Sequence, residues 1–267
     1  MVDPGELRML DGSLRTAMTE CSAASGPKLD AALIDLGWFD MLDEMPDVAI
    51  PLVFRLLGET GAHAPALNDV VLRAAGAAPG RTLPLPFAGG SWVIWERAAD
   101  GGSALGGLPI RSVPEGNPVP LAAGRRALGW WLVGTGRTML SLARQHALDR
   151  VQFGRQISSF QAIRHRLAET LVAIEGAEAT LDVAAAEPGD GLASSLAKAA
   201  AGRAALTSAR HCQQVLAGLG FTAEHQLHHH IKRALVLDGL LGSARELTRQ
   251  AGATLRAKGF APRVAEL

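Results

Sequence analysis

The spacing of apolar residues divides the 267-residue chain into three segments, of which the first is helical. Up to about residue 78, apolar positions recur at helical spacing in runs that end at glycines. One run follows Asp47, which we expect to be the N-cap of a helix that buries Ile50 and Phe54. The pattern therefore predicts an N-terminal helical domain over residues 1–78.

Residues 79–120 have a different pattern, rich in proline and glycine. Three short apolar runs, at Leu83–Phe87, Ser91–Trp95 and Leu108–Val113, alternate with turn residues such as Asp100-Gly101-Gly102. This alternation is typical of short strands joined by turns. Because 42 residues are few for an independent β-domain, we predict a truncated β region that packs on its neighbours.

The helical pattern returns, more strongly, over residues 121–267. Four stretches have helical apolar spacing: Trp130–Asp149, Ser158–Ala186, Leu192–Leu216 and Ile231–Leu255, the last as one helix or a pair. In the second stretch the predicted buried face holds Ile163, Leu167, Leu171 and Ile174. Long helices with short connections favour an antiparallel four-helix bundle. The expected fold class is therefore mainly α.

Charge and composition exclude several classes of partner. Lys and Arg together number 26, as do Asp and Glu, so a net charge of zero favours neither nucleic acid nor an anionic membrane. Cys21 and Cys212 are far apart and fit two reduced thiols. The N-terminal residues are not typical of a signal peptide, and no apolar run reaches the roughly 20 residues of a membrane span. We expect a cytoplasmic protein.

Two motifs in the C-terminal segment become specific when they are taken together. The first is the run Arg150-Val151-Gln152-Phe153-Gly154-Arg155-Gln156-Ile157 with Phe160-Gln161, and the second is Gln214-Val215-Leu216-Ala217-Gly218-Leu219-Gly220-Phe221. Alone, Arg150 is typical of a helix C-terminus and Gly218-Leu219-Gly220 of a helix stop. In this order and separation they resemble the R-x-Q-F-G-x-x-I…F-Q and Q-x-x-G-G-x-G-[YF] signatures of the acyl-CoA dehydrogenase family.

The resemblance implies an acyl-CoA dehydrogenase fold and a set of FAD contacts. In such dehydrogenases this face of the bundle contacts the diphosphate and adenine of the FAD of a neighbouring subunit, so the cofactor is shared. The residues that carry this role here are Arg150, Gln152, Phe153, Phe160, Gln161, Gln214 and Gly218. The guanidinium fork of Arg150 suits a diphosphate, and a glycine at 218 lets backbone approach a ligand.

The chain departs from the family where the reaction needs a base. Members remove the α-proton of an acyl thioester with a Glu carboxylate. An ungapped comparison places Leu241 at that position, and the alternative base of some members falls near Gly124-Arg125-Arg126, which has no carboxylate either. Asp238, one helical turn earlier, is the nearest substitute, although a solvated or capping aspartate is the simpler interpretation. The β region also lacks the family's segment that binds the flavin ring.

These losses lead to three hypotheses. By resemblance to heterotetrameric α2β2 dehydrogenases of actinobacterial steroid and cholesterol degradation, the chain is a shortened, non-catalytic subunit that completes the FAD site of a catalytic paralogue. The complex would oxidise a bulky acyl-CoA thioester and pass electrons to an electron-transfer flavoprotein. The second hypothesis is an active homo-oligomer with a relocated base such as Asp238. The third is a non-enzymatic helical protein that binds acyl-CoA or a protein partner.

A cluster of histidines is the remaining chemical signal. His225 and His228 have the spacing of two metal ligands on one helical face. Neither a Glu nor a Cys accompanies them at a metalloprotease or zinc-finger spacing. We therefore interpret the cluster as a polar turn and expect no metal.

Overall fold

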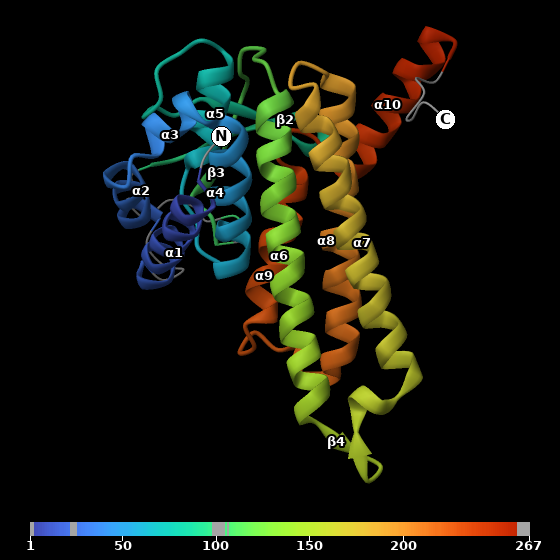
Figure 1. Cartoon of the computed structure of the whole chain (residues 1–267). Helices are drawn as coiled ribbons and strands as arrows, with labels where there is room; N and C mark the ends of the chain where they lie inside the picture. The colour runs from blue at the N-terminus through green and yellow to red at the C-terminus, as the bar shows by residue number, and fades with distance from the viewer. Residues whose placement is uncertain (1–2, 22–25, 98–104, 106, 261–267) are drawn as a thin grey trace.

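The structure is a computed structural model in which residues 3–21, 26–97, 105 and 107–260 are described (Figure 1). Within them, α-helices dominate and the larger of two sheets lies in the middle of the chain. The predicted turn Asp100-Gly101-Gly102 lies outside the described residues. The mainly α fold class expected from the hydrophobic pattern is confirmed. No helix in the described ranges has the length and apolar character needed to cross a membrane.

Helices make up the N-terminal part of the chain: α1 (Pro4–Glu20), α2 (Gly26–Asp35), α3 (Trp38–Glu44), α4 (Pro46–Thr60) and α5 (Ala66–Ala74). The predicted buried face of α4 is confirmed, with Phe54 fully buried. The predicted N-cap was wrong, because Met45 holds that position and Asp47 lies in the first turn. Pro46 sets this start, since its fixed φ and missing N–H suit the first helical position.

The middle segment forms the short strands predicted from its pattern, and they pair in a three-stranded antiparallel sheet. Its strands are β1 (Pro84–Phe87), β2 (Ser91–Trp95) and β3 (Ile110–Val113), in the order β1-β2-β3. The sheet buries Leu85, Val93 and Trp95 against the helices. The Asn68 side-chain amide of α5 donates to the Trp95 carbonyl at 2.9 Å, which fixes β2 to the N-terminal helices.

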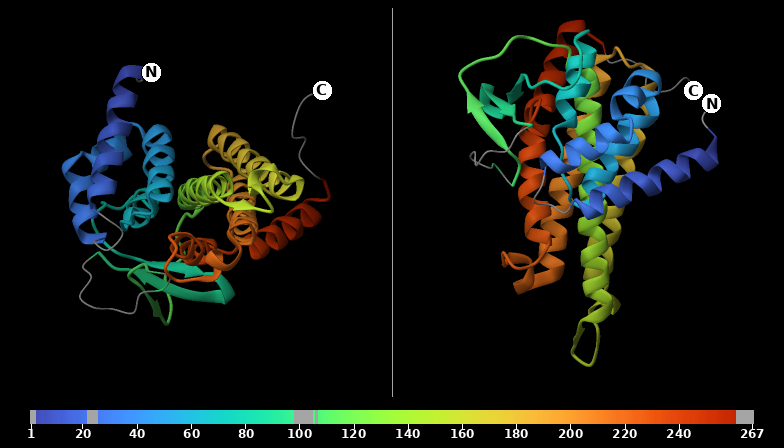
Figure 2. Two further views of the ribbon diagram at one scale, coloured as in Figure 1. Left: turned by 90° about the horizontal axis from the view of Figure 1, so that it is seen from below. Right: turned by 90° about the vertical axis from the view of Figure 1, so that its left-hand side faces the viewer.

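The C-terminal segment is the antiparallel bundle predicted from the pattern. Its helices are α6 (Ala122–Asp149), α7 (Gln161–Ala186), α8 (Gly191–Leu216) and α9 (Leu227–Gly239), and α10 (Ala244–Lys258) follows. In Figure 1, α10 points away from the bundle. The last predicted stretch is thus a pair of helices. Figure 2 shows the N-terminal helices beside the bundle and the sheet along one side of both.

A backbone contact between α4 and α6 joins the N-terminal helices to the bundle. A Cβ atom on Gly58 would lie 2.4 Å from the Trp131 carbonyl oxygen, and one on Gly134 would lie 2.2 Å from the Arg55 carbonyl oxygen. Only glycine permits this approach. One hydrophobic core runs through all three segments, and the proposed domain boundaries at residues 78 and 120 stay a prediction.

The buried face of α7 differs from the predicted one at a single position. Leu171 is 42% exposed, whereas its neighbour Thr170 is fully buried. The Thr170 hydroxyl lies 3.0 Å from His211 Nδ1 of α8 and bonds the Arg166 carbonyl at 2.7 Å. Because its hydroxyl is satisfied in this way, a threonine takes the buried position that the apolar pattern assigned to the leucine.

Candidate functional site

The first signature forms a hairpin at one end of the bundle (Figure 1). Helix α6 ends at Asp149, and its C-cap is Arg150, whose N–H donates to the His146 carbonyl at 2.9 Å. Strands β4 (Val151–Gln152) and β5 (Arg155–Gln156) then pair around Phe153 and Gly154. Both turn residues have positive φ, 53° and 77°, which is the type I′ geometry of tight hairpins. This geometry leaves the Phe153 side chain 91% exposed.

Six of the seven predicted FAD contacts line one groove, which we call the hairpin groove. It has a volume of about 840 Å³ and lies between the end of α6, the hairpin, the start of α7 and the end of α8. The six residues are Arg150, Gln152, Phe153, Phe160, Gln214 and Gly218. Gln161 lies instead in a neighbouring depression, where its Nε2 is 3.4 Å from His165 Nε2.

Cationic and aromatic groups of the hairpin lie together at the groove. With its amide oxygen facing Arg150, Gln152 accepts hydrogen bonds from Nη2 at 2.6 Å and Nε at 3.2 Å. Phe160 is flanked by Phe153, at 6.2 Å and 87° between ring planes, and by the Arg155 guanidinium 4.3 Å from its centroid. The arrangement offers two guanidinium groups and an aromatic surface, which suit an anion and a planar ring.

The second signature builds the opposite wall with a strained turn. Ala217, where the signature has its first glycine, adopts φ 50° and ψ −128°, a conformation that disfavours residues with a Cβ atom. A Cβ atom on Gly220 would lie 2.6 Å from the Gln213 carbonyl oxygen, so this glycine is needed for the turn. A Cβ atom on Gly218 would meet no atom within 4 Å, which leaves its backbone open toward the groove.

The sequence analysis missed one residue that lines the groove, His146, and one beside it, Arg155. Arg155 lies inside the first signature, but only the hairpin brings its guanidinium over Phe160. His146 lies one turn before Arg150 on α6 and lines the groove. Burial, with the nearby Arg150 charge, lowers the pKa of His146, so this imidazole is neutral near pH 7. The helical spacing of four residues before Arg150 was the available signal for His146.

The position at which the sequence comparison places the family's base is closed. Leu241 has φ 56° and is 1% exposed. Its N–H donates to the Pro86 carbonyl at 2.8 Å, and its carbonyl accepts from Arg125 Nε at 3.1 Å. Its side chain packs close to Gly124, where an added Cβ atom would lie 2.8 Å from Leu241 Cδ1. A leucine fills this site and offers no proton acceptor.

The carboxylate of Asp238 is bonded to backbone. Its Oδ1 accepts from the N–H of Ala244, the first residue of α10, at 3.0 Å. The buried Lys198 ammonium donates to the Asp238 carbonyl at 2.5 Å and also to the Gly242 carbonyl. Burial lowers the pKa of Lys198 to about 7. This geometry matches a structural aspartate in the last turn of α9 that bonds the start of α10, rather than a free base.

Of the two adjacent basic residues of α9, Lys232 and Arg233, only the second has a structural role. Arg233 is buried and donates to the carbonyls of Gly61 and Ala62, the latter at 3.0 Å. These carbonyls follow α4, which ends at Thr60. Arg233 therefore joins α9 to the N-terminal helices, whereas Lys232 is exposed.

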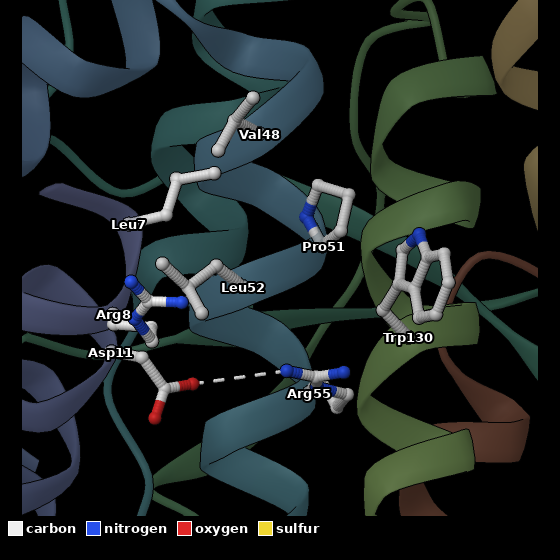
Figure 3. A pocket seen from close by; sticks show the side chains of 8 residues that line it. All are labelled: Leu7, Arg8, Asp11, Val48, Pro51, Leu52, Arg55 and Trp130. Atoms are coloured by element: carbon white, nitrogen blue, oxygen red, sulfur yellow. Dashed lines mark ion pairs between the residues drawn. The ribbon is translucent and has the colours of Figure 1, made fainter. Parts of the chain in front are cut away.

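A second cavity, of about 440 Å³, lies between α1, α4 and α6 (Figure 3). Leu52 and Trp130 contribute apolar surface to it. Two arginines, Arg8 and Arg55, also line it. Arg55 faces Asp11, with Nη2 3.7 Å from Oδ1, and its Nε lies 3.5 Å from Glu59. The charge of Arg55 is thus balanced within the chain, and none of the predicted contact residues lies there.

The histidine cluster brings together no metal-binding set. In the described part of the chain, no group of three or more His, Cys, Asp and Glu side chains is placed to hold a metal ion. His225 Nδ1 instead accepts from the Leu227 N–H at 3.1 Å, at the first residue of α9.

Comparison with protein families identifies the chain. Residues 119–254, just over half of it, match the family model "Acyl-CoA dehydrogenase, C-terminal domain". The matched range contains the whole bundle, the hairpin groove and the Leu241 position. The chain belongs to the acyl-CoA dehydrogenase family, whose members depend on FAD.

Comparison with individual proteins supports the same family. Acyl-CoA dehydrogenase FadE34 of Mycobacterium tuberculosis is 32% identical over 281 positions, which cover 96% of this chain and 38% of that protein. The chain thus spans well under half of this curated relative. Two solved structures share the fold. The Tcur3481-Tcur3483 steroid ACAD G363A variant has a TM-score of 0.73 and 18% identity, covering 96% of this chain and 98% of the other. The ChsE4-ChsE5 complex from Mycobacterium tuberculosis has a TM-score of 0.72 and 20% identity, covering 98% of this chain and 99% of the other.

Proposed function

We propose that the chain is the non-catalytic subunit of a heteromeric FAD-dependent acyl-CoA dehydrogenase, whose hairpin groove completes the FAD site of a catalytic paralogue. One observation carries the proposal. Six residues expected to contact FAD line a single open groove, while a buried leucine occupies the position of the base. A chain with these two features has a ligand surface and no means of removing the substrate proton.

The groove's donor set fits the adenosine diphosphate half of FAD. Arg150 and Arg155 supply positive charge for the diphosphate, and Phe160 with Phe153 supplies aromatic surface for a planar ring. Gln214 adds an exposed amide at the end of α8. Bound FAD would supply the acceptor for the substrate hydride. The proton would go to a carboxylate of the paralogue, because Leu241 has none.

Exposed apolar side chains around the groove support a protein partner there. Val151, Phe153, Leu219 and Phe221 are each at least half exposed. Large apolar side chains grouped on a surface are typical of an interaction site. A partner that covered them would also cover the groove and exclude water from a bound cofactor.

The similar structures support the kind of complex and of substrate. One is a complex of ChsE4 with ChsE5, and another is a steroid ACAD. We extend these descriptions to an α2β2 assembly that oxidises a bulky, steroid-derived acyl-CoA thioester in the cholesterol degradation class. An electron-transfer flavoprotein would accept its electrons.

Co-expression tests the proposal. The chain is purified alone and together with a full-length paralogue that retains the glutamate base, and the flavin spectrum and turnover of both preparations are recorded. We expect yellow, active protein only from the pair. Active, yellow protein from the single chain contradicts the proposal and favours a relocated base. Colourless protein from both favours the non-enzymatic hypothesis.

Arg150→Ala tests the assigned contact within the complex. A charge-assisted hydrogen bond contributes about 1.5–3 kcal/mol, so FAD affinity should fall roughly 10- to 100-fold. Arg144→Ala is the matched control, because Arg144 is an exposed arginine of α6 that does not line the groove. Unchanged FAD content in Arg150→Ala would refute the contact.

A further inference from the structure

The cavity between α1, α4 and α6 has an apolar part and a charged part. Its apolar wall is formed by half-buried side chains of all three helices: Leu7, Val48, Pro51, Leu52 and Trp130. Its charged residues, Arg8, Asp11 and Arg55, lie together at one end, opposite the end at Val48 (Figure 3). The volume of about 440 Å³ falls within the roughly 300–1,000 Å³ of small-molecule pockets. The cavity therefore has the size and the mixed lining of a ligand site.

Helical spacing places the lining residues on the helix faces that meet at the cavity. On α4 they fall within about two turns of one face: Val48, Pro51, Leu52 and Arg55. On α1 they lie within the first turns: Leu7, Arg8 and Asp11. Arg15 Nη2 lies 2.8 Å from Glu59 Oε2 and fixes α1 to α4. Because helices hold side chains more precisely than loops do, this placement favours binding of a defined ligand.

The charged end carries one positive charge in excess. Arg55 pairs with Asp11 and Glu59, at 3.7 and 3.5 Å. Arg15 pairs with the same two carboxylates, so these four charges balance. Among the described residues the exposed Arg8 forms no ion pair, and it lines the same end of the cavity. An anion bound at this end would therefore neutralise a charge that the chain leaves unpaired.

Arg55 also keeps hydrogen-bond donors that its carboxylate neighbours do not use. Its Nε is buried without a hydrogen-bond partner. The distance of 3.7 Å from its Nη2 to Asp11 Oδ1 is longer than a hydrogen bond. A guanidinium group presents five N–H donors in a fork that matches a carboxylate. The charge of Arg55 is balanced within the chain, but its donors suit a further group that carries oxygen atoms.

We propose that this cavity binds a small amphipathic monocarboxylate. Its carboxylate accepts hydrogen bonds from Arg8 and Arg55, and a ring-sized apolar body covers Pro51, Leu52 and Trp130. Burial of these half-buried side chains supplies the main driving force, and the single excess charge favours a monoanion. None of the lining residues belongs to the hairpin groove. The proposal therefore does not rest on the proposed function, and its failure leaves that function untouched.

Isothermal titration calorimetry of the full chain tests the proposal. The probes are 2-naphthoate, an apolar monocarboxylate, and 2-naphthalenemethanol, its neutral analogue. We expect 2-naphthoate to bind with a dissociation constant on the order of 50 μM. The alcohol should bind at least ~5-fold more weakly, because it lacks the charge that Arg8 and Arg55 recognise. The proposal is overturned if 2-naphthoate does not bind at about 1 mM, or if the two probes bind equally well.

Two variants locate the bound probe. Val48→Trp fills the apolar end of the cavity and should weaken binding of 2-naphthoate at least ~20-fold. Arg8→Gln removes the excess charge and should weaken it about 5-fold. Val183→Trp and Arg144→Gln are the matched controls, because both residues are exposed and lie outside the cavity. Both controls should bind like the wild type.

The melting temperature of each variant shows whether the fold is retained. Arg8→Gln changes an exposed side chain and should melt like the wild type, so it carries the test if Val48→Trp unfolds. Wild-type affinity in either folded variant overturns the proposal.

Arg150→Ala separates this cavity from the hairpin groove, which also offers guanidinium groups and an aromatic surface. We expect Arg150→Ala to leave the affinity for 2-naphthoate unchanged. Loss of binding in Arg150→Ala, with binding retained in Val48→Trp, would place the probe in the hairpin groove and overturn the proposal.

Discussion

The hairpin groove and the turn from α9 into α10 are two sites of one bundle that differ in what their polar groups contact. At the groove, Arg150, Gln152 and Gln214 are exposed and Phe153 projects into solvent. At the α9–α10 turn, Leu241 is buried and both of its backbone polar groups are bonded within the chain. Buried Lys198 bonds two further carbonyls of the turn.

The difference separates polar groups that remain available to a ligand from polar groups that the fold itself uses. Groups at the groove contribute little to folding and stay available to a ligand. Groups at the α9–α10 turn stabilise the fold, because their hydrogen bonds are made to other groups of the chain. A variant should therefore affect stability at the turn and assembly at the groove, and the predictions below are arranged by the size of the expected effect on stability.

The largest effect is expected for Lys198→Ala. The substitution leaves two half-buried carbonyls without their donor and opens a cavity, which should lower the free energy of unfolding by about 4 kcal/mol. Chemical denaturation measures the change. Lys232→Ala, at an exposed lysine of α9, should stay within about 0.5 kcal/mol of wild type. A loss below about 1 kcal/mol for Lys198→Ala would show that the turn does not depend on this residue.

The next effect is a pH dependence that originates at His230. Burial, assisted by the charges of Arg233 and His229, lowers the pKa of His230 to about 4. The folded-state pKa lies below the unfolded-state pKa of about 6.5. The stabilisation that neutral His230 gives the fold is therefore complete above pH 6.5 and is lost as pH falls through 4. The full contribution of His230 to the free energy of unfolding is roughly 3 kcal/mol. The free energy of unfolding measured from pH 7.5 to 4 should fall less steeply in His230→Gln.

His165→Gln is the control for that measurement, since His165 is exposed on α7. Its pH profile should match the wild type. Equal slopes in His230→Gln and wild type would mean that His230 is not the group that titrates.

A smaller and opposite effect is expected for Ala217→Gly. Alanine at φ 50°, ψ −128° is strained, and glycine relieves the strain at some cost in unfolded-chain entropy. The net stabilisation should be about 1 kcal/mol, measured as a higher midpoint of chemical denaturation. Ala217→Val should change stability in the other direction. A destabilised glycine variant would argue against strain at this turn.

The smallest effect on stability is expected for Phe153→Asn. The side chain is exposed, and Asn-Gly is favoured in a type I′ turn, so the free energy of unfolding should change by less than about 0.5 kcal/mol. The same variant removes an aromatic group from the groove and should reduce FAD retention in the complex with the paralogue. Full FAD retention would remove Phe153 from the proposed site.

Much of the fold followed from residue spacing. The helical periods of α6, α7 and α8 predicted their extents to within a few residues, except at the start of α6, and the apolar runs predicted the strands. The two signatures predicted six residues of one groove, because short-range motifs at a helix end and a helix stop depend on local chain geometry. The absence of a carboxylate at Leu241 was also visible in the sequence alone.

Only the tertiary structure decided which side chains face outward and which polar groups are occupied. The period of α7 did not distinguish Leu171 from Thr170, because the buried position depends on a bond to His211 of another helix. The same period also did not predict that Gln161 lies outside the groove. The roles of Lys198 and Arg233 depend on carbonyls 40 or more residues away. Sequence spacing determines where elements form, whereas burial and hydrogen bonding between distant segments determine what each side chain is free to do.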